Sequence, residues 1–155
     1  SEYLRRIFLD NELAEGKFEV DGAPVAMRDI AVPVFCVSTT GDHVAPWRSV
    51  YKLHLLTDTE VTFLLTSGGH NAGIVSEPGH RGRHYQVHTR PPAERYLSPD
   101  AWRQEAEARD GSWWPELVEW LRERSSGTTP CPPLGTKRGP CRAGADAPGS
   151  YVFQR

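Results

Sequence analysis

Two continuous apolar runs constrain the fold of this 155-residue chain more than any other feature. In the runs Val32–Ser38 and Val61–Thr66, apolar residues occupy successive positions, so both faces of a strand formed there would be apolar. A strand without a polar face is typical of a sheet that helices cover on both sides. Each run is far shorter than the roughly 20 residues that span a bilayer. We therefore predict two buried strands of an α/β domain.

The stretch between the two runs predicts a crossover helix. Pro46 favours a helix start. The apolar and aromatic residues after it share one face at helical spacing: Trp47, Val50, Tyr51 and His54. Strand, helix and strand in this order are typical of parallel sheets. We expect the two strands to be adjacent and parallel, joined by a right-handed crossover.

Weaker patterns predict the other elements. Residues 2–14 are expected to form a helix with Leu4, Ile7 and Phe8 on its inner face. The pair Asp21-Gly22 between apolar residues predicts a hairpin. Further along, we expect a short strand over Tyr85–His88 and a helix from Ser98 to about Ala108. A last helix is expected after Pro115, with three residues facing inward: Leu117, Trp120 and Leu121.

Residues 1–126 are predicted to form one domain and residues 127–155 an irregular tail. Ten of the last 29 residues are Gly or Pro, which disfavours regular structure there. The chain opens at Ser1 and enters an apolar pattern at once. We therefore expect it to be part of a longer protein.

Charge and cysteine content exclude several classes of protein. With 18 basic and 20 acidic residues, the chain has no positive field for nucleic acid. The chain has three cysteines, and they form no C-x-x-C pair: Cys36, Cys131 and Cys141. This number and spacing argue against a disulfide scaffold and against a zinc site. We therefore expect a reducing, cytoplasmic setting. Cys36 lies within an apolar run as a small hydrophobe, and the other two lie in the tail.

Histidine spacing gives no metal site. His80, His84 and His88 recur every four residues, but in a segment rich in Pro and Gly rather than on a helix. We therefore predict that no metal is bound there.

One acidic and one imidazole side chain follow the two predicted strands. Asp42 comes after the first strand, and His70 comes after the second, behind Gly68-Gly69. Functional groups of open α/β sheets lie at the carboxyl ends of strands. A carboxylate there could orient the imidazole, which could then take a proton from a nucleophile. The alternatives are a turn-forming Asp and a structural His, and His43 is either a supporting group or a polar loop residue.

A carboxylate followed by a histidine on successive strands is the order of the α/β-hydrolases, whose nucleophile precedes both on a G-x-[S/C]-x-G elbow. No such elbow occurs in these 155 residues. The aromatic residues Trp113, Trp114 and Trp120 could form a ligand platform, but such residues are more often core anchors, which is the reading we favour.

Several strings resemble the polyhydroxyalkanoate synthases, in that family's order. Residues 41–47 (GDHVAPW) resemble their D-H-[IV]-A-P-W segment, and residues 68–75 (GGHNAGIV) resemble their G-H-x-A-G segment. Residues 111–115 (GSWWP) are similar to their G-S-W-W-P segment. Residues 11–16 and the closing residues 147–152 are also similar to theirs. The match is best to the class that makes polyesters with short side chains.

The resemblance implies an α/β-hydrolase fold, of which this chain would be the carboxy-terminal portion with the last parallel strands and their flanking helices. Asp42 matches the family's catalytic aspartate and His70 its catalytic histidine, while the Cys nucleophile would lie upstream of Ser1. The same segments place His43, Trp47 and Asn71 around the pair as supporting neighbours.

The resemblance also implies a substrate and partners. The substrate would be an (R)-3-hydroxyacyl-coenzyme A, polymerised into a polyester with release of coenzyme A, and neither a metal nor a further cofactor would be needed. The complete protein would be a homodimer in the cytoplasm, at the surface of polyester granules, and this chain would need its missing amino-terminal part for activity.

Two other functions stay open at this point. A hydrolase, either an esterase or a polyester depolymerase, would share the Asp and His but transfer the acyl group to water. A non-catalytic fragment of the synthase would keep the fold without the nucleophile. An upstream elbow with Cys favours the synthase, and one with Ser favours the hydrolase.

Overall fold

The computed structural model describes residues 1–136, 138 and 142–154, so Cys141 lies outside the described residues. The chain divides into two compact units, Ser1–Glu123 and Arg124–Arg155. In the described part of the second unit, the regular elements are a 3-10 helix, η3 (Tyr151–Phe153), and isolated bridges from Gly135 and Thr136 to Arg142. The predicted division after residue 126 stays a prediction. None of the described helices is long and apolar enough to cross a membrane.

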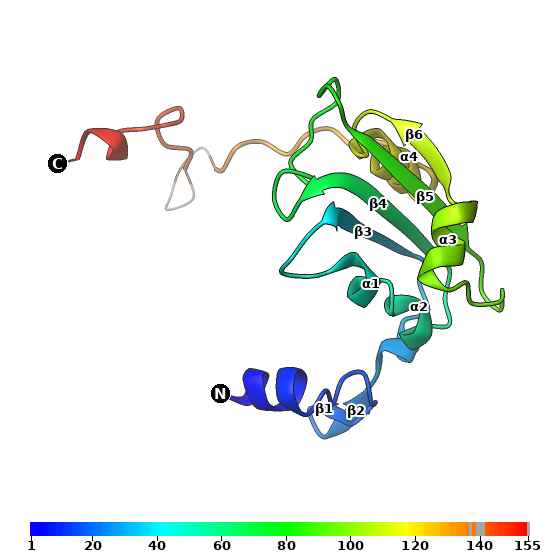
Figure 1. Ribbon diagram of the computed structural model, residues 1–155. Helices are drawn as coiled ribbons and strands as arrows, with labels where there is room; N and C mark the ends of the chain where they lie inside the picture. The colour runs from blue at the N-terminus through cyan, green and yellow to red at the C-terminus, as the bar shows by residue number, and fades with distance from the viewer. Residues whose placement is uncertain (137, 139–141, 155) are drawn as a thin grey trace. The chain divides into compact units, whose positions relative to one another are not determined.

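A four-stranded sheet forms the centre of the first unit, in the order β3-β4-β5-β6 (Figure 1). Its strands are β3 (Val34–Gly41), β4 (Val61–Gly69), β5 (His84–Arg90) and β6 (Glu107–Asp110). β3 and β4 are parallel, as predicted, with Val34 opposite Val61 and Thr39 opposite Thr66. Their carboxyl ends therefore lie side by side.

The two parallel strands have different limits from those predicted. β3 begins two residues later than expected, after Pro33, which has no N–H to donate to a ladder. Val32 is 66% exposed instead of buried. Both strands also run three residues further than predicted, as far as Gly41 and Gly69.

The other half of the sheet is antiparallel. β5 covers the predicted short strand Tyr85–His88 and pairs antiparallel with β4. The helix expected from Ser98 to about Ala108 is confirmed as far as Glu105 and is wrong over its last three residues. Helix α3 (Pro99–Glu105) ends early, and the chain extends from Ala106 into β6, which pairs with β5. The Gln86 side chain donates to the carbonyls of Arg103 and Ala106, so β5 itself helps to end the helix.

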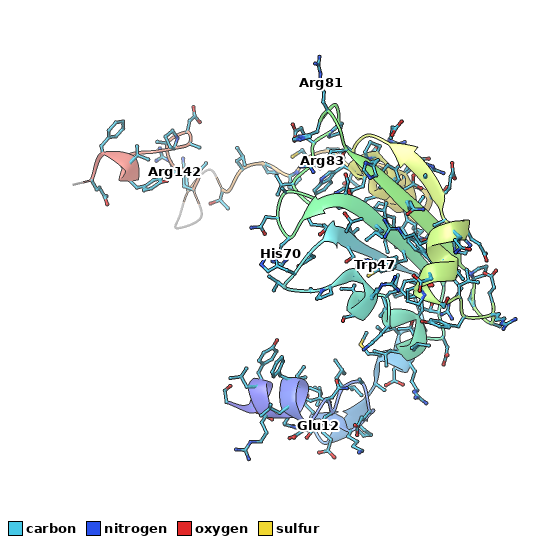
Figure 2. All side chains as sticks on the ribbon, in the orientation of Figure 1. Glu12, Trp47, His70, Arg81, Arg83 and Arg142 are labelled. Atoms are coloured by element: carbon cyan, nitrogen blue, oxygen red, sulfur yellow. The ribbon has the colours of Figure 1, made fainter. Side chains whose placement is uncertain are left out.

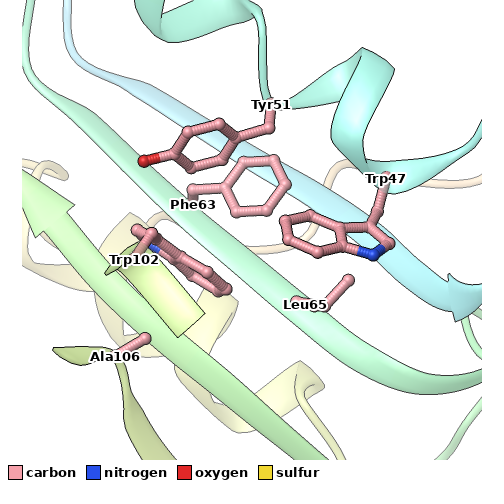
Figure 3. Packing of buried hydrophobic residues seen from close by; sticks show 6 residues of the cluster. All are labelled: Trp47, Tyr51, Phe63, Leu65, Trp102 and Ala106. Carbon is pink, nitrogen blue, oxygen red and sulfur yellow. The ribbon is translucent and has the colours of Figure 1, made fainter. Parts of the chain in front are cut away.

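Alternating residues of β4 point to opposite faces of the sheet, and each face has its own core. Figure 3 shows one core, in which aromatic rings from α1 (Trp47–Val50), β4 and α3 pack together with α2 (Leu53–Leu56) nearby. Its buried members are Trp47, Tyr51, Phe63, Leu65, Trp102 and Ala106. The side chains predicted to share a face after Pro46 do pack at this core, but the single helix expected there is wrong, since the chain forms two four-residue helices, α1 and α2.

The second core lies under α4 (Trp114–Glu123) on the other face of the sheet. Leu64 is fully buried there, and Leu117 of α4 packs against the cluster. The rings of Phe35 and Trp120 meet edge to face at 5.6 Å. The prediction for Leu121 is wrong, since it is 49% exposed. Trp114 and Val118 are exposed too, so α4 presents an apolar outer face.

The amino-terminal segment differs most from expectation. The pair Asp21-Gly22 turns between β1 (Phe18–Val20) and β2 (Ala23–Val25), with positive φ at both residues, so the hairpin is confirmed. A short 3-10 helix, η2 (Met27–Asp29), follows. The helix predicted over residues 2–14 is instead a seven-residue π-helix, η1 (Tyr3–Leu9). Its expected inner residues Leu4 and Phe8 are 54% and 75% exposed.

His54 should make this unit sensitive to acid. Its side chain is buried between Tyr51 and Phe63, and neither ring nitrogen has a hydrogen-bond partner among the described residues. Burial, with Arg90 and His88 nearby, lowers the pKa of His54 to about 4. The pKa of His54 is therefore lower in the folded protein than in the unfolded chain, where it is about 6.5. The contribution of such a group to the stability of the fold is fully present above the unfolded pKa. It is lost as the pH falls toward the folded pKa of about 4.

Between pH 7 and pH 5 we expect His54 to account for about 2 kcal/mol of lost unfolding free energy. Urea unfolding at the two pH values measures this. His54→Leu should lose correspondingly less stability on acidification, whereas His84→Gln, at an exposed position, should behave as the parent chain does. Equal losses in His54→Leu and the parent would contradict the assignment.

Candidate active site

Asp42 and His70 meet at the paired carboxyl ends of β3 and β4. Asp42 follows the last residue of β3, and His70 follows the last residue of β4. His70 Nδ1 lies 2.8 Å from Asp42 Oδ2, so its N–H donates to the carboxylate. The expected hydrogen-bond contact between these side chains is therefore present. Figure 2 shows His70 at this end of the sheet.

The other carboxylate oxygen of Asp42 is held by the backbone. Oδ1 accepts hydrogen bonds from the N–H groups of Val44 at 2.8 Å and Ala45 at 2.9 Å. The side chain is only 10% exposed. The Ala45 N–H, then His70 and the Val44 N–H, lower the pKa of Asp42 to about 2. Asp42 is thus a fixed carboxylate at any pH at which the protein would work.

His70 is placed to exchange a proton at its other ring nitrogen. Its side chain is 46% exposed, and within the part of the chain that the structure describes, its only hydrogen bond is the one at Nδ1. A carboxylate on Nδ1 fixes the tautomer with a lone pair on Nε2 and stabilises the imidazolium that forms when Nε2 takes a proton. The pair can therefore act as a general base toward an alcohol or a thiol.

The turn that carries His70 depends on backbones that pass very close together. Gly68 has φ +110°, a conformation that side chains disfavour. A Cβ on Gly73 would lie 2.6 Å from Thr39 Cγ2 and 3.0 Å from the carbonyl oxygens of Ser67 and Gly69. The Gly73 N–H donates to the Gly69 carbonyl at 3.0 Å, which closes the turn around His70.

A segment distant in the sequence holds the far side of this turn. The indole N–H groups of Trp113 and Trp114 both donate to the carbonyl of Ile74, at 3.1 and 3.0 Å. The Ser112 hydroxyl donates to the carbonyl of Ser76. Trp113 is 4% exposed and packs in the second core. The sequence predicted both tryptophans as core anchors, which is confirmed for Trp113 but wrong for Trp114, which is 39% exposed. No signal in the sequence indicated that they hold the turn after His70.

The supporting neighbours expected around the pair lie in different settings. His43 is exposed, and Trp47 belongs to the first core with Arg48 over its ring at 4.9 Å. Asn71 contributes its backbone carbonyl, which accepts from the Ile74 and Val75 N–H groups. Among the described residues, no side-chain hydrogen bond joins His43 or Asn71 to Asp42 or His70.

Cys36, the cysteine of the first unit, is not placed as the nucleophile beside His70. Cys36 precedes Asp42 by six residues along β3, about 20 Å at the rise of a strand. Burial raises the pKa of the Cys36 thiol to about 11, which disfavours the thiolate. Cys131 is exposed in the second unit.

The histidines at positions 80, 84 and 88 do not gather. His80 pairs with Glu77 at 3.2 Å, whereas His84 and His88 lie along β5. Across the described residues, no three His, Cys, Asp or Glu side chains are grouped so as to hold a metal ion.

The chain is similar in sequence to several curated polymerases. It is 32% identical over 153 residues to poly(3-hydroxyalkanoate) polymerase subunit PhaC of Rhizobium meliloti, covering 99% of this chain and 24% of that protein. Identity is 35% to poly(3-hydroxyalkanoate) polymerase of Methylorubrum extorquens, over 97% of this chain and 24% of that protein. Identity is 34% to poly(3-hydroxyalkanoate) polymerase subunit PhaC of Cupriavidus necator, over 97% of this chain and 25% of that protein.

The chain thus spans about a quarter of the length of these relatives. No protein-family model matches it.

The close approach at Gly73 predicts a specific mutational cost. Gly73→Ala should destabilise the first unit by about 1–3 kcal/mol, because its methyl group would overlap Thr39 and two backbone carbonyls. Gly69→Ala is the matched control, since a Cβ there meets only the Gly41 carbonyl at 3.9 Å. Thermal unfolding of the two variants tests this. Equal melting temperatures would show that the backbone at Gly73 has room for a methyl group, contrary to the prediction.

Proposed function

We propose that this chain, which is homologous to about a quarter of the length of the poly(3-hydroxyalkanoate) polymerases, supplies the Asp and His of a Cys-His-Asp triad in such an enzyme. The hydrogen bond from His70 Nδ1 to Asp42 Oδ2 is the observation that carries the proposal. Its place at the ends of two parallel strands supports an α/β-hydrolase fold, with this chain as the carboxy-terminal portion.

The nucleophile would come from the rest of the polymerase. Within the described residues, β3 pairs with β4 along one edge, and its other edge has no strand beside it. A further parallel strand there would bring its own carboxyl end next to Asp42 and His70. In this proposal, that strand leads into the elbow with the catalytic cysteine.

Acylation would begin with proton transfer to His70. Nε2 takes the proton of the cysteine thiol, and the thiolate attacks the carbonyl carbon of an (R)-3-hydroxyacyl-coenzyme A. The bond from that carbon to the coenzyme A sulfur breaks, and His70 returns the proton to the leaving thiolate. Asp42 stabilises the imidazolium between these two transfers.

Elongation would use the same pair on an alcohol. The 3-hydroxyl of one hydroxyacyl unit loses its proton to Nε2 and attacks the carbonyl carbon of the other unit, which is held as a thioester. An ester bond forms as the carbon–sulfur bond breaks, and the imidazolium of His70 returns the proton to the departing thiolate sulfur. Because an alcohol is far less acidic than a thiol, this step depends more strongly on the base.

The wider setting of the proposal follows from the sequence resemblance. The reaction as written needs neither a metal nor a further cofactor. The complete enzyme would act as a homodimer at the surface of cytoplasmic polyester granules.

Replacement of His70 tests the proposed function. In a complete polymerase that contains this segment, His70→Ala should lower the rate of coenzyme A release by roughly 10²–10⁴-fold or more, since it removes the base for both steps. His88→Gln, on β5 and away from this end of the sheet, should retain the parent rate. Near-parent polymerisation by His70→Ala would refute the proposal, and release of free hydroxy acids instead of polymer by the parent would favour a hydrolase.

Replacement of Asp42 should separate the two steps. Asp42→Asn keeps the size of the side chain but lets His70 adopt the wrong tautomer. A thiol is a few per cent ionised near pH 7, so acylation should survive better than elongation. Single-turnover release of coenzyme A, compared with polymer growth, measures the difference. Equal losses in the rates of acylation and elongation would mean that Asp42 only orients His70. An undiminished rate of polymer growth in Asp42→Asn would show that Asp42 does not belong to the triad.

A further inference from the structure

Arg83 lies near the turn that carries His70 and forms no ion pair with any carboxylate in the described part of the chain. Its Nε is buried and makes no hydrogen bond within the described residues. Four other arginines of the first unit form ion pairs with carboxylates: Arg6, Arg48, Arg109 and Arg122. Arg90, whose Nε is also buried, donates from Nη2 to the Thr57 carbonyl. Burial of part of a charged guanidinium without a hydrogen-bond partner costs free energy. The unpartnered Nε of Arg83 therefore points to a missing anionic partner.

The surroundings of Arg83 fix it against the turn that carries His70. A Cβ built on Gly68, two residues before His70, would lie 2.7 Å from Arg83 Nη1, so the guanidinium packs on that glycine. The Arg83 carbonyl accepts from the Gly111 N–H at 2.7 Å, and the next backbone N–H donates to Ser67 Oγ at 3.1 Å. These bonds fix the backbone at Arg83, and its guanidinium lies against Gly68.

The loop around Arg83 carries more positive than negative charge. Arg81 lies on the same loop, and Figure 2 shows both arginines on the connection from β4 to β5. The nearby carboxylate of Glu77 pairs with His80 at 3.2 Å, and its own backbone N–H, then His80 and lastly Arg83, lower the pKa of Glu77. Among the described residues, no carboxylate forms an ion pair with Arg81 or Arg83.

We propose that Arg83, together with Arg81, binds phosphate groups of the coenzyme A part of the substrate. This inference rests on the function proposed above, in which the substrate is an acyl-coenzyme A. The substrate enters at the end of the sheet where His70 lies, and both arginines lie on the loop that begins at His70. The planar fork of a guanidinium matches phosphate oxygens and pairs with two of them at once.

The test compares two thioesters of the same acyl group in the complete polymerase. (R)-3-Hydroxybutyryl-coenzyme A carries the phosphates, and (R)-3-hydroxybutyryl-pantetheine lacks them. Arg83→Gln should raise KM for the first substrate by roughly 10- to 100-fold and leave KM for the second within about threefold. Arg83→Lys, which keeps the charge but loses the fork, should fall between. Arg103→Gln, an exposed arginine on α3, should change neither KM.

The outcomes separate this inference from the proposed function. An equal rise in KM for both thioesters in Arg83→Gln would overturn the inference. Arg83 would then have a role in the structure of the turn, for example as the partner of a carboxylate from the rest of the enzyme. Unchanged KM values for both would overturn it as well. A parent enzyme that polymerises neither thioester would instead refute the proposed function. Added salt should raise KM for the coenzyme A substrate more in the parent than in Arg83→Gln.

Discussion

The parallel pairing of β3 with β4 is the constraint from which the site follows. Parallel strands place their carboxyl ends at the same edge, and the register of Thr39 opposite Thr66 leaves a few residues on each strand before the turn. Asp42 and His70 are therefore brought together across 28 residues of sequence by the backbone ladder. An antiparallel pairing of the same strands would put them at opposite ends of the sheet.

Two groups of residues hold that arrangement steady. On the inner side, Gly68 and Gly73 allow the turn after β4 to lie against the end of β3. On the outer side, Trp113 and Trp114 tie the Ile74 carbonyl to the start of α4. The turn that carries His70 thus depends on residues at the start of α4, a helix distant in the sequence.

The sequence predicts the parts of this structure in which one local pattern decides the outcome. Apolar runs located β3 and β4, and Asp42 and His70 could be singled out because they directly follow those runs. The pattern failed where distant contacts decide. Residues 107–110 have no strand pattern and form β6 because β5 offers a partner. Leu4 and Phe8 have a helical spacing but stay exposed.

The tie from Trp113 and Trp114 to Ile74 could not be predicted either, because an indole N–H gives no sign in a sequence of which carbonyl it will reach. The same holds for Arg83, whose importance comes from what is missing around it. Charge patterns in a sequence show which residues are ionised, but whether a counterion is near depends on the folded backbone.

The two outer strands of the sheet have very different chemistry. β6 presents Glu107, Arg109 and Asp110, and its charged, exposed residues discourage another strand from adding to it. β3, with the sequence VFCVSTTG, has no charge along its eight residues. Such an edge is a template for strands of other molecules, so separate copies of this segment would be prone to aggregate as their concentration rises. A cell that makes this segment with the β3 edge uncovered would need a chaperone to protect that edge.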